Sequence, residues 1–578
     1  MNQRLQLPVT AIEAEFRRVM RTVGTAAVSA PTGSGKSTQI PQWLLTETPE
    51  DSRIIVLQPR RLAARMLAER VACELGEKPG ERVGYVTRFE HVVSPRSRIV
   101  FVTEGILTRM LLSPGDMDRV SAVMFDEFHQ RSINADLGLA MAAELRRKSR
   151  PDLKLIVTSA TLDSARVCTY LEDCPSLVSE GKLHPVEISY IRRNGITDCC
   201  RLAADAVQEL LQEGVQGDIL VFMPGVSEIR RCGDEIRRRR WGSEMEILPL
   251  YGDMSPQAQR AVMEPAAKRK IIIATNIAET SLTIPGVRIV VDSGLVRLNR
   301  RDALRGVDVL ETVPICADAA AQRAGRAGRE APGRCIRLWS AIEQDHKKPH
   351  TPPEIQRLDL ADPLLSVHAA GFRDDRSFPW FEAPPEKNAD AARALLYELE
   401  LLDGAGALTE RGRGVRAIPA HPRLALLLLE GALSGCRELA CGCAALLSGR
   451  PMLNRASGGT LTELRGKERR NSRANDAPAS DFTAQLQLLH QAEQFHFRQD
   501  ECASMGVNGV AAAEISRDMK FFLGLRLPAP LKNNQERSPE CALAQTLLKC
   551  FPDKLARKLD QGSLNCELQG RKRAQLSP

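Results

Sequence analysis

Short apolar runs alternate with amphipathic helical patterns along the first part of the chain. Runs that suit buried strands lie at 25–30, 53–59, 97–103, 122–128 and 153–161. Helical patterns lie at 36–45, 62–75 and 138–148. A strand covered on both faces is apolar throughout, so this alternation predicts a parallel sheet with helices on both sides.

The same rhythm restarts near residue 200. Further strand-like runs lie at 218–225, 246–252, 270–276, 287–294 and 333–340. The pattern breaks near His184 and Pro185, where we place a boundary between two lobes. One large sheet is the alternative, but the chemical motifs described below divide between two lobes.

Beyond residue 345 the strand-like runs stop and helical patterns take over. A short hairpin pattern at 402–412 is typical of the wing of a winged-helix domain, and 421–449 is strongly helical. The polar stretch 453–481 carries KERRNSR, which suits a solvated basic loop or a nucleic-acid contact. The expected domains are 1–184, 185–345, 346–420, 421–528 and 529–578. The abrupt end leaves open whether the last of these is a complete module.

The composition is that of a soluble globular protein, with 43% hydrophobic and 26% charged residues. Only 4% of the residues are aromatic, which argues against base stacking as the main mode of nucleic-acid contact. The net charge of +8 suits a polyanionic partner, although an Arg-rich surface alone would give the same value.

The cysteines and the N-terminus indicate a compartment. The 15 cysteines include no CxxC pair, so no zinc spacing is present. The start, MNQRLQLPVT, does not resemble a signal peptide, and no apolar run is long enough to span a membrane. We therefore expect a reducing cytoplasm, with the cysteines acting as small core residues.

A glycine-rich phrase lies between the first strand-like run and the first helical pattern. It comprises Gly33, Ser34, Gly35, Lys36, Ser37 and Thr38. Glycines let backbone N–H groups curl around phosphates, and the helix N-terminus adds a positive field. We expect Lys36 to reach the β- and γ-phosphates and the Ser37 hydroxyl to hold Mg²⁺. Ala30 stands where the P-loop formula has its first glycine.

Two carboxylates, Asp126 and Glu127, end an apolar run. A phosphate-hydrolysing site needs one carboxylate at the magnesium and one that accepts a proton from the attacking water. We assign Asp126 to the first role and Glu127 to the second. A surface turn is the alternative interpretation of this pair.

The phrase QRAGRAGR places Gln322, Arg326 and Arg329 at positions i, i+4 and i+7. On one α-helix this spacing puts all three on one face. Gln322 can orient water, and the two arginines can reach the γ-phosphate as arginine fingers when the lobes close. Arg323 lies off that face and is not expected to act so. A basic helix facing solvent is the alternative.

These phrases, with QPRRLAA at 58–64, TEGIL at 103–107, SAT at 159–161 and ATNIAETSLTIPGV at 274–287, closely resemble the superfamily 2 DEAH-box helicases. The phrases TPPEIQRLDLADPLL, FMPGVSEI and DEFH resemble the bacterial HrpB-type branch. The resemblance implies an α/β protein with two RecA-like parallel-sheet lobes. Smaller, mainly helical domains would follow, a winged helix and a ratchet-like domain.

The resemblance also implies an activity. It is hydrolysis of ATP or another NTP with Mg²⁺, coupled to 3′-to-5′ translocation on single-stranded nucleic acid and to duplex unwinding. RNA is the favoured substrate, while DNA stays open because track contacts go mostly to phosphate and sugar. A monomer or weak oligomer without membrane association is expected.

Further residues take their roles from the resemblance. Those that match the nucleic-acid track are Arg60, Arg61, Thr103, Glu104, Thr275 and Asn276. Those that match the motifs coupling hydrolysis to lobe movement are Ser159, Thr161, Glu279, Ser281 and Thr283. Arg70 matches a residue that stacks on the base of the nucleotide.

A few positions depart from the family pattern. Phe128 replaces the alanine of DEAH, which leaves the metal and base positions untouched. Gln130 stands where the family more often has glutamate, and Pro224 stands where a threonine often contacts the nucleic-acid backbone. Met263 takes the place of an aromatic on the other side of the base, which fits tolerance for several NTPs.

Residues 295–313 alternate around a turn at 302–306 and predict a β-hairpin. In the resembling helicases such a hairpin wedges at the duplex junction or blocks the exit of the strand, and an ordinary structural hairpin is the alternative. Two other functions stand beside an active helicase: an ATPase that remodels without separating strands, and a non-catalytic scaffold. The intact residues Lys36, Asp126 and Glu127 argue against the scaffold, and no acceptor-site motif supports a P-loop kinase.

Overall fold

The computed structural model describes most of the chain. The described residues are 7–113, 115–160, 164–181, 184–191, 198–252, 254–279, 284–302, 307–453, 480–530, 538–560, 564–568 and 572–575. The chain divides into two compact units. The first comprises Met1–Asp359 and Pro379–Asn388, and the second comprises Leu360–Phe378 and Ala389–Pro578.

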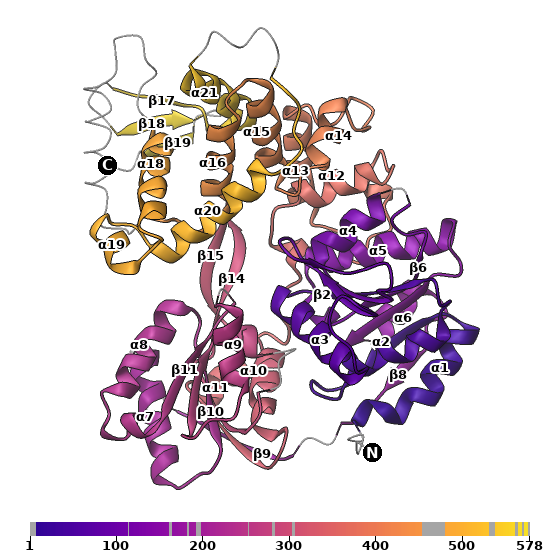
Figure 1. The fold of residues 1–578 in the computed structure, drawn as a ribbon, viewed down its shortest axis with the longest axis vertical. Coiled ribbons are helices and arrows are strands. Elements are labelled where there is room, and N and C mark those ends of the chain that lie inside the picture. The colour runs from indigo at the N-terminus through magenta and orange to yellow at the C-terminus, as the bar shows by residue number, and fades with distance from the viewer. Residues whose placement is uncertain are drawn as a thin grey trace. The chain divides into compact units, whose positions relative to one another are not determined.

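The first lobe of the first unit is built on a mostly parallel sheet, in the order β4-β3-β5-β2-β6-β7-β1-β8 (Figure 1). Its strands are β1 (Thr25–Ser29), β2 (Arg53–Gln58), β3 (Val83–Val86), β4 (His91–Val92), β5 (Ile99–Thr103), β6 (Val120–Phe125), β7 (Lys154–Ser159) and β8 (Ser176–Val178). The strand β1, which runs into the glycine-rich loop, thus lies in the interior of the sheet, two places from β6, the strand that Asp126 follows.

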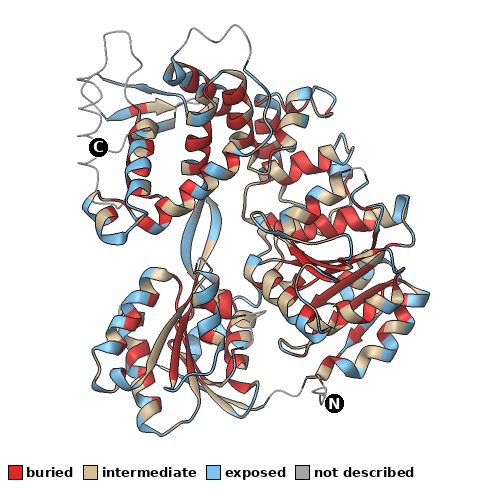
Figure 2. Ribbon diagram, in the orientation of Figure 1, coloured by how far each residue is buried: buried red, intermediate tan, exposed pale blue. Residues whose placement is uncertain are grey.

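Helices cover both faces of this sheet, as the apolar strands predicted. They are α1 (Glu13–Thr22), α2 (Lys36–Glu47), α3 (Arg61–Glu74), α4 (Glu104–Leu112), α5 (Ile133–Lys148) and α6 (Ser164–Leu171). Side chains alternate between faces along a strand. In β2, Ile54 and Val56 therefore pack with α1 to α3, while Ile55 and Leu57 pack with α4 to α6. Both layers are buried (Figure 2).

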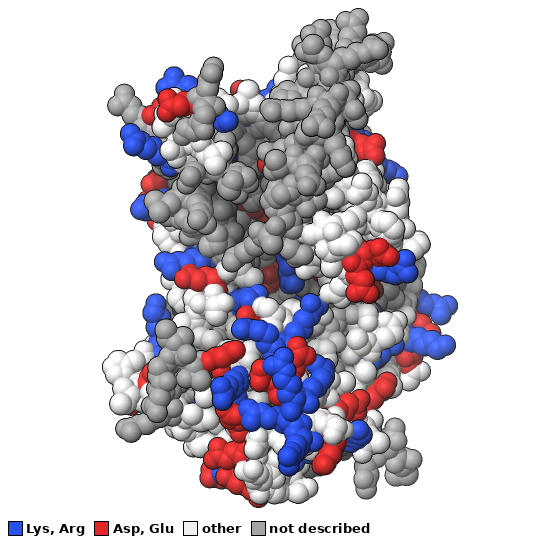
Figure 3. Space-filling view, turned by 90° about the vertical axis from the view of Figure 1, so that its left-hand side faces the viewer, with Lys and Arg blue, Asp and Glu red and all other residues white. Residues whose placement is uncertain are grey.

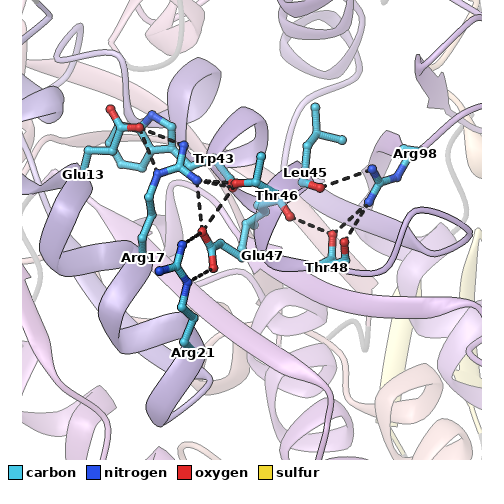
Figure 4. Close-up of polar contacts among 10 residues, drawn as sticks. Glu13, Arg17, Arg21, Trp43, Leu45, Thr46, Glu47, Thr48 and Arg98 are labelled. Atoms are coloured by element: carbon cyan, nitrogen blue, oxygen red, sulfur yellow. Dashed lines mark hydrogen bonds and ion pairs between the residues drawn. The ribbon is translucent and has the colours of Figure 1, made fainter.

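Helix α2, which begins at Lys36, is held firmly at its other end (Figure 4). The buried Glu47 carboxylate accepts hydrogen bonds from Arg21 and Arg17 of α1, with the Arg21 Nε at 2.7 Å and the Arg17 guanidinium at 3.1 Å. Arg98 donates to the carbonyl oxygens of Leu45 and Thr48 at 3.2 and 3.3 Å. Because the last carbonyls of a helix lack partners within it, these contacts satisfy the C-terminus of α2.

The second lobe has a parallel sheet in the order β11-β12-β10-β13-β16-β9. Its strands are β9 (Val186–Tyr190), β10 (Asp218–Phe222), β11 (Glu246–Leu250), β12 (Lys270–Ala274), β13 (Val287–Asp292) and β16 (Gly333–Arg337). Its helices are α7 (Cys199–Gln212), α8 (Val226–Arg237), α9 (Pro256–Met263), α10 (Ala317–Ala324) and α11 (Ala341–Asp345). Strands β14 (Leu295–Asp302) and β15 (Val307–Pro314) form the expected antiparallel hairpin.

The second unit is mainly helical. Its helices are α12 (Ala361–Ala369), α13 (Glu386–Glu398), α14 (Glu410–Arg416), α15 (Pro422–Leu433), α16 (Arg437–Ser448), α18 (Asp481–Gln494), α19 (Gln499–Ser504), α20 (Gly509–Leu523) and α21 (Pro539–Cys550), the first turn of α13 belonging to the first unit. A bridge between Leu402 and Leu408 marks the predicted short hairpin. The names winged helix and ratchet-like, and the domain boundaries, stay predictions.

Several expected elements need correction. Strands β3, β4, β8 and β9 were not expected, because they are short or exposed and lack a long apolar run. The stretch 421–449 is helical as predicted and forms two helices, which Gly435 separates at a φ of 80° that favours glycine. The statement that strands stop beyond 345 is wrong, since β17 (Ala556–Lys558), β18 (Asn565–Leu568) and β19 (Lys572–Gln575) form a sheet. The basic stretch KERRNSR lies outside the described residues.

Candidate active site

The glycine-rich loop connects β1 to α2 as the sequence predicted. Gly33 and Gly35 have φ angles of 85° and 93°, a region that L-residues with a side chain seldom adopt. Gly35 is the N-cap of α2, and Lys36 is its first residue. The backbone N–H groups of this turn lie at the positive end of a helix, where anions bind.

Lys36 and Glu127 face each other at the bottom of this loop. Both side chains are buried, and the Lys36 Nζ lies 3.2 Å from the Glu127 Oε1. Burial opposes ionisation of Glu127, but the ammonium of Lys36, followed by His129, outweighs it and lowers the pKa of Glu127 to about 2. Glu127 is therefore ionised at neutral pH and able to accept a proton.

Asp126 is fixed by residues from the strands on either side of β6. The Gln58 Nε2 at the end of β2 donates to its Oδ2 at 2.5 Å, and the Thr158 hydroxyl of β7 donates to its Oδ1. The Ser37 hydroxyl lies close enough to this carboxylate to act on its pKa, which it lowers. Burial, with the adjacent Glu127 charge, raises the pKa of Asp126 above its ordinary value. The predicted metal residues Ser37 and Asp126 are thus adjacent.

Gln58 and Thr158 were missed by the sequence interpretation. Both are fully buried polar residues at or beside the end of an apolar strand. Parallel strands present their carboxyl ends at the same edge of a sheet, so this position was the signal that could have found them. Their contacts orient the carboxylate of Asp126, as residues behind a metal ligand commonly do.

The predicted arginines of the second lobe reach the same place. The Arg329 guanidinium carbon lies 3.4 Å from where a Cβ on Gly33 would stand, so it lies against the phosphate loop. Arg326 is buried, and its Nε donates to the Glu279 carbonyl at 3.0 Å. Burial lowers the pKa of Arg329 to about 10 despite the Glu127 charge. Burial, with the positive charge of Arg329, lowers the pKa of Arg326.

Arg326 is buried and Arg329 is partly buried, and with Lys36 they place positive charge around the Glu127 carboxylate. This arrangement suits a ligand with several negative charges, such as a nucleoside triphosphate. In the described part of the chain the buried Ser34 Oγ and Glu127 Oε2 have no hydrogen-bond partner, although the His129 Nδ1 lies 3.5 Å from the Glu127 Oε2.

The arginine segment is not the single helix that we expected. Helix α10 ends at Ala324, and a 3₁₀ turn covers Gly325–Gly328, so Arg326 and Arg329 follow the helix instead of lying along it. Arg323 has a structural role. Its guanidinium donates to the carboxylates of Glu279 and Asp292, both at 2.9 Å. It also lies over the ring of Phe222, 4.8 Å from the ring centroid.

A cavity of about 630 Å³ within the first unit joins residues of both lobes. The predicted site residues that line it are Arg60, Glu104, Asn276, Glu279 and Gln322. It is also lined by residues that the sequence interpretation missed, Arg131, Arg166, Glu354, Arg357 and Glu382 among them. Gln322 and His129 both face this space, so the predicted water-orienting amide lies near the DEFH segment.

The structure places the predicted nucleic-acid residues in three local settings. The Arg60 guanidinium donates to the Asn276 carbonyl at 2.8 Å, which links the two lobes, and Thr275 precedes that residue. Arg61 lies 4.9 Å over the ring of Phe89. Thr103 and Glu104 begin helix α4. Their contacts to nucleic acid stay predictions.

The coupling and base-stacking residues are only partly described. Ser159 is buried, and its carbonyl accepts from the Ala30 N–H at 3.0 Å, next to the phosphate loop. Glu279 accepts hydrogen bonds from Arg323 through its carboxylate and from Arg326 through its carbonyl. Thr161, Ser281 and Thr283 lie outside the described residues. Arg70 is mostly exposed on α3, where its Nε donates to Glu74 at 2.6 Å.

The cysteines agree with their expected role as small core residues. Among the described residues all 15 are free, and most are buried as small apolar side chains. Within the same residues, no helix is long and apolar enough to cross a membrane.

Comparison with known proteins gives consistent matches. The profile of the DEAD/DEAH box helicase domain matches residues 10–168, and that of the helicase conserved C-terminal domain matches residues 203–331. The chain is 39% identical over 449 residues to the ATP-dependent RNA helicase HrpB of Escherichia coli strain K12, covering 77% of this chain and 55% of HrpB.

It is also 39% identical over 458 residues to the pre-mRNA-splicing factor ATP-dependent RNA helicase prp22 of Schizosaccharomyces pombe, covering 77% of this chain and 39% of prp22. A crystal structure of the Escherichia coli DEAH/RHA helicase HrpB matches with a TM-score of 0.78 and 33% identity, over 98% of this chain and 66% of that one. The chain therefore spans about half or less of the length of these curated relatives.

Proposed function

Because the chain belongs to the DEAD/DEAH box helicases and is similar to their HrpB-type members, we propose that it is an ATP-dependent helicase acting on RNA. One observation carries the proposal. Arg329 from the second lobe lies against Gly33 of the phosphate loop, so the site is assembled from both lobes. Hydrolysis can then be coupled to lobe movement.

The proposed steps use residues of this chain. Lys36 and the backbone N–H groups of the loop bind the β- and γ-phosphates. Glu127 accepts a proton from the attacking water while Gln322 orients it. Arg326 and Arg329 stabilise the charge that develops on the γ-phosphate. We assign Asp126 and Ser37 to Mg²⁺, which when bound neutralises phosphate charge.

The nucleic-acid side of the proposal rests on the family motifs. Arg60 and Arg61, with Thr103, Thr275 and Asn276, would contact the backbone of a single strand, which moves 3′-to-5′ through the protein. Such contacts read no sequence. We further propose that the protein works in the cytoplasm as a monomer or weak oligomer. A tailed RNA duplex is the expected substrate.

The test compares NTP hydrolysis and unwinding. Wild type should hydrolyse ATP with Mg²⁺ and do so faster with single-stranded RNA, and it should unwind an RNA duplex with a 3′ tail. Lys36→Ala should abolish hydrolysis. Glu127→Gln should keep nucleotide binding and lose turnover, since the metal residue Asp126 remains in place.

The controls separate the alternatives. A duplex with a 5′ tail should not be unwound, and a DNA duplex with a 3′ tail tests the choice of RNA. Hydrolysis without unwinding would favour a remodelling ATPase. Normal turnover by Glu127→Gln would show that another residue is the base.

A further inference from the structure

The loop that carries Glu127 has an unusual backbone on both sides of a short turn. Glu127 and Arg131 have φ angles of 54° and 47°, in the left-handed region that residues with a side chain seldom adopt. Between them lies a 3₁₀ turn, Phe128–Gln130. Such a conformation persists only where surrounding contacts hold it.

An aromatic contact holds the first half of this turn. The ring of Phe128 is 2% exposed and meets the ring of Phe381 edge-to-face, at 5.3 Å between centroids. Phe381 also meets Tyr170 at 5.1 Å, and the Tyr170 hydroxyl donates to the Pro379 carbonyl at 2.6 Å. The residue that replaces alanine in this DEAH variant thus has a partner more than two hundred positions further along the chain.

An ionic contact holds the second half of the turn. The Arg131 guanidinium donates to Asp136 at 2.8 and 2.9 Å and to Glu382 at 2.7 Å. It also lies 4.7 Å over the ring of Phe381. Arg166 joins from α6, with its guanidinium 3.0 Å from the Glu382 carboxylate. Arg131, Asp136 and Glu382 are largely buried, where charge-assisted contacts restrict geometry strongly, whereas Arg166 is exposed.

Phe381 and Glu382 lie in a short segment where the chain returns to the first unit. Residues 379–388 belong to the first unit, whereas 360–378 and the chain after 388 belong to the second. The chain thus returns to the first unit for one short segment, and that segment supplies both Phe381 and Glu382.

We propose that the segment 379–388 positions the general base of hydrolysis, with Phe381 and Glu382 as its positioning residues. This inference rests on the proposed function. Phe381 fixes Phe128, which directly follows Glu127, and Glu382 fixes Arg131 at the far end of the turn. Release of the segment would let the turn relax and move the Glu127 carboxylate away from the attacking water, while the phosphate loop keeps its own contacts.

The kinetic test uses Phe381→Ala in the full chain. The kcat for ATP should fall by about 10- to 100-fold, because small errors in placing a catalytic group have effects of this size. The KM and the affinity for a non-hydrolysable ATP analogue should stay within about twofold. Phe381→Leu, which keeps most of the packing, should recover most of the kcat.

The matched control is Phe378→Ala. Phe378 is as buried as Phe381 and lies three positions before it, but its ring meets Phe372 in the second unit. Its kcat should stay near wild type. The double variant Phe128→Ala with Phe381→Ala should lose no more than Phe381→Ala alone, because that single variant already removes the contact with Phe128.

Amide hydrogen exchange tests the contact between the segment and the turn directly and does not depend on NTP hydrolysis. Amide hydrogen exchange in Phe381→Ala should rise at Gln130 and Arg131, whose N–H groups bond within the turn, and stay unchanged in β6. Unchanged exchange at the turn, unchanged kcat, or equal losses of kcat and nucleotide affinity would each overturn the positioning role. A wild type without NTPase activity would instead reject the proposed function.

Discussion

At the scale of single residues, Glu104 has a raised pKa that affects the stability of the fold whether or not the protein is a helicase. It is the first residue of α4, and its carboxylate accepts a hydrogen bond from the Ser132 hydroxyl. Burial raises the pKa of Glu104 to about 8; the bond from Ser132 opposes this rise, and the charges of Glu354 and Asp136 add to it. An ordinary glutamate in an unfolded chain ionises near pH ~4.3.

This difference predicts a pH-dependent stability. The folded-state pKa is raised, so the contribution of Glu104 is fully present below pH ~4.3 and is lost as the pH rises to about 8. Glu104→Gln cannot ionise and should therefore gain stability relative to wild type over this range. Each unit of pKa corresponds to about 1.4 kcal/mol.

The measurement is the denaturant midpoint of both proteins from about pH 5 to about pH 9. Glu81→Gln, at an exposed position, is the control and should follow wild type. A constant difference between Glu104→Gln and wild type at all pH values would contradict the prediction.

At the scale of elements, the arginine segment shows how local sequence and packing combine. Gly325 and Gly328 weaken an α-helix, and a Cβ on Gly328 would lie 2.5 Å from the His184 carbonyl oxygen. Helix α10 therefore gives way to a tighter turn that approaches the start of the second lobe closely. The turn directs Arg326 and Arg329 to the first lobe, while Arg323 on the helix stays in the core of the second.

This division predicts different losses for neighbouring arginines. Arg329→Ala should lower kcat by about 10³-fold or more, because its charge acts in the transition state, and should change nucleotide affinity less. Arg323→Ala should mainly lower stability, by about 3–5 kcal/mol, because it leaves the carboxylates of Glu279 and Asp292 unpaired.

Turnover, nucleotide affinity and unfolding midpoint should be measured for both variants. Equal losses of affinity and turnover in Arg329→Ala would assign it to ground-state binding instead. A folded, stable Arg323→Ala protein without turnover would show that Arg323 takes part in the reaction.

At the scale of the whole molecule, the distribution of charge and the hairpin decide how nucleic acid could be handled. On the face shown in Figure 3, basic and acidic side chains are interleaved. Arginines of α8 and the residues after it pair with acidic residues, as in Arg237 with Asp234 and Arg239 with Asp205. Residues 226–240 still hold six arginines against three acidic residues, so part of the excess of +8 lies there. The hairpin is anchored at its base, where Val296 packs on Trp339 and Ile315.

The hairpin predicts a separation of activities. Shortening residues 300–307 to a tight turn should spare most RNA-stimulated NTP hydrolysis and impair unwinding of a 3′-tailed duplex, since strand separation needs a rigid obstacle. The anchored base stays in place, so the second lobe should keep its fold. Unwinding at the wild-type rate would reject the wedge, and loss of both activities would show that the hairpin only supports the fold.

The sequence alone determined the local chemistry and most of the regular elements. The phosphate loop, the carboxylate pair and the strands around them depend on short-range patterns of glycine, charge and apolar runs. Strands such as β1, β2 and β10 were predicted within about one residue, or within about three where the motif continued past the strand.

Tertiary structure decided the rest. The contacts of Gln58 and Thr158 to Asp126, the end of α10 at Ala324, and the return of Phe381 to Phe128 join residues far apart in sequence. No local pattern contains them, because burial and distance exist only after the chain has folded. Phe128 illustrates the difference: the sequence showed a departure from alanine, and only the fold showed the ring against which it packs.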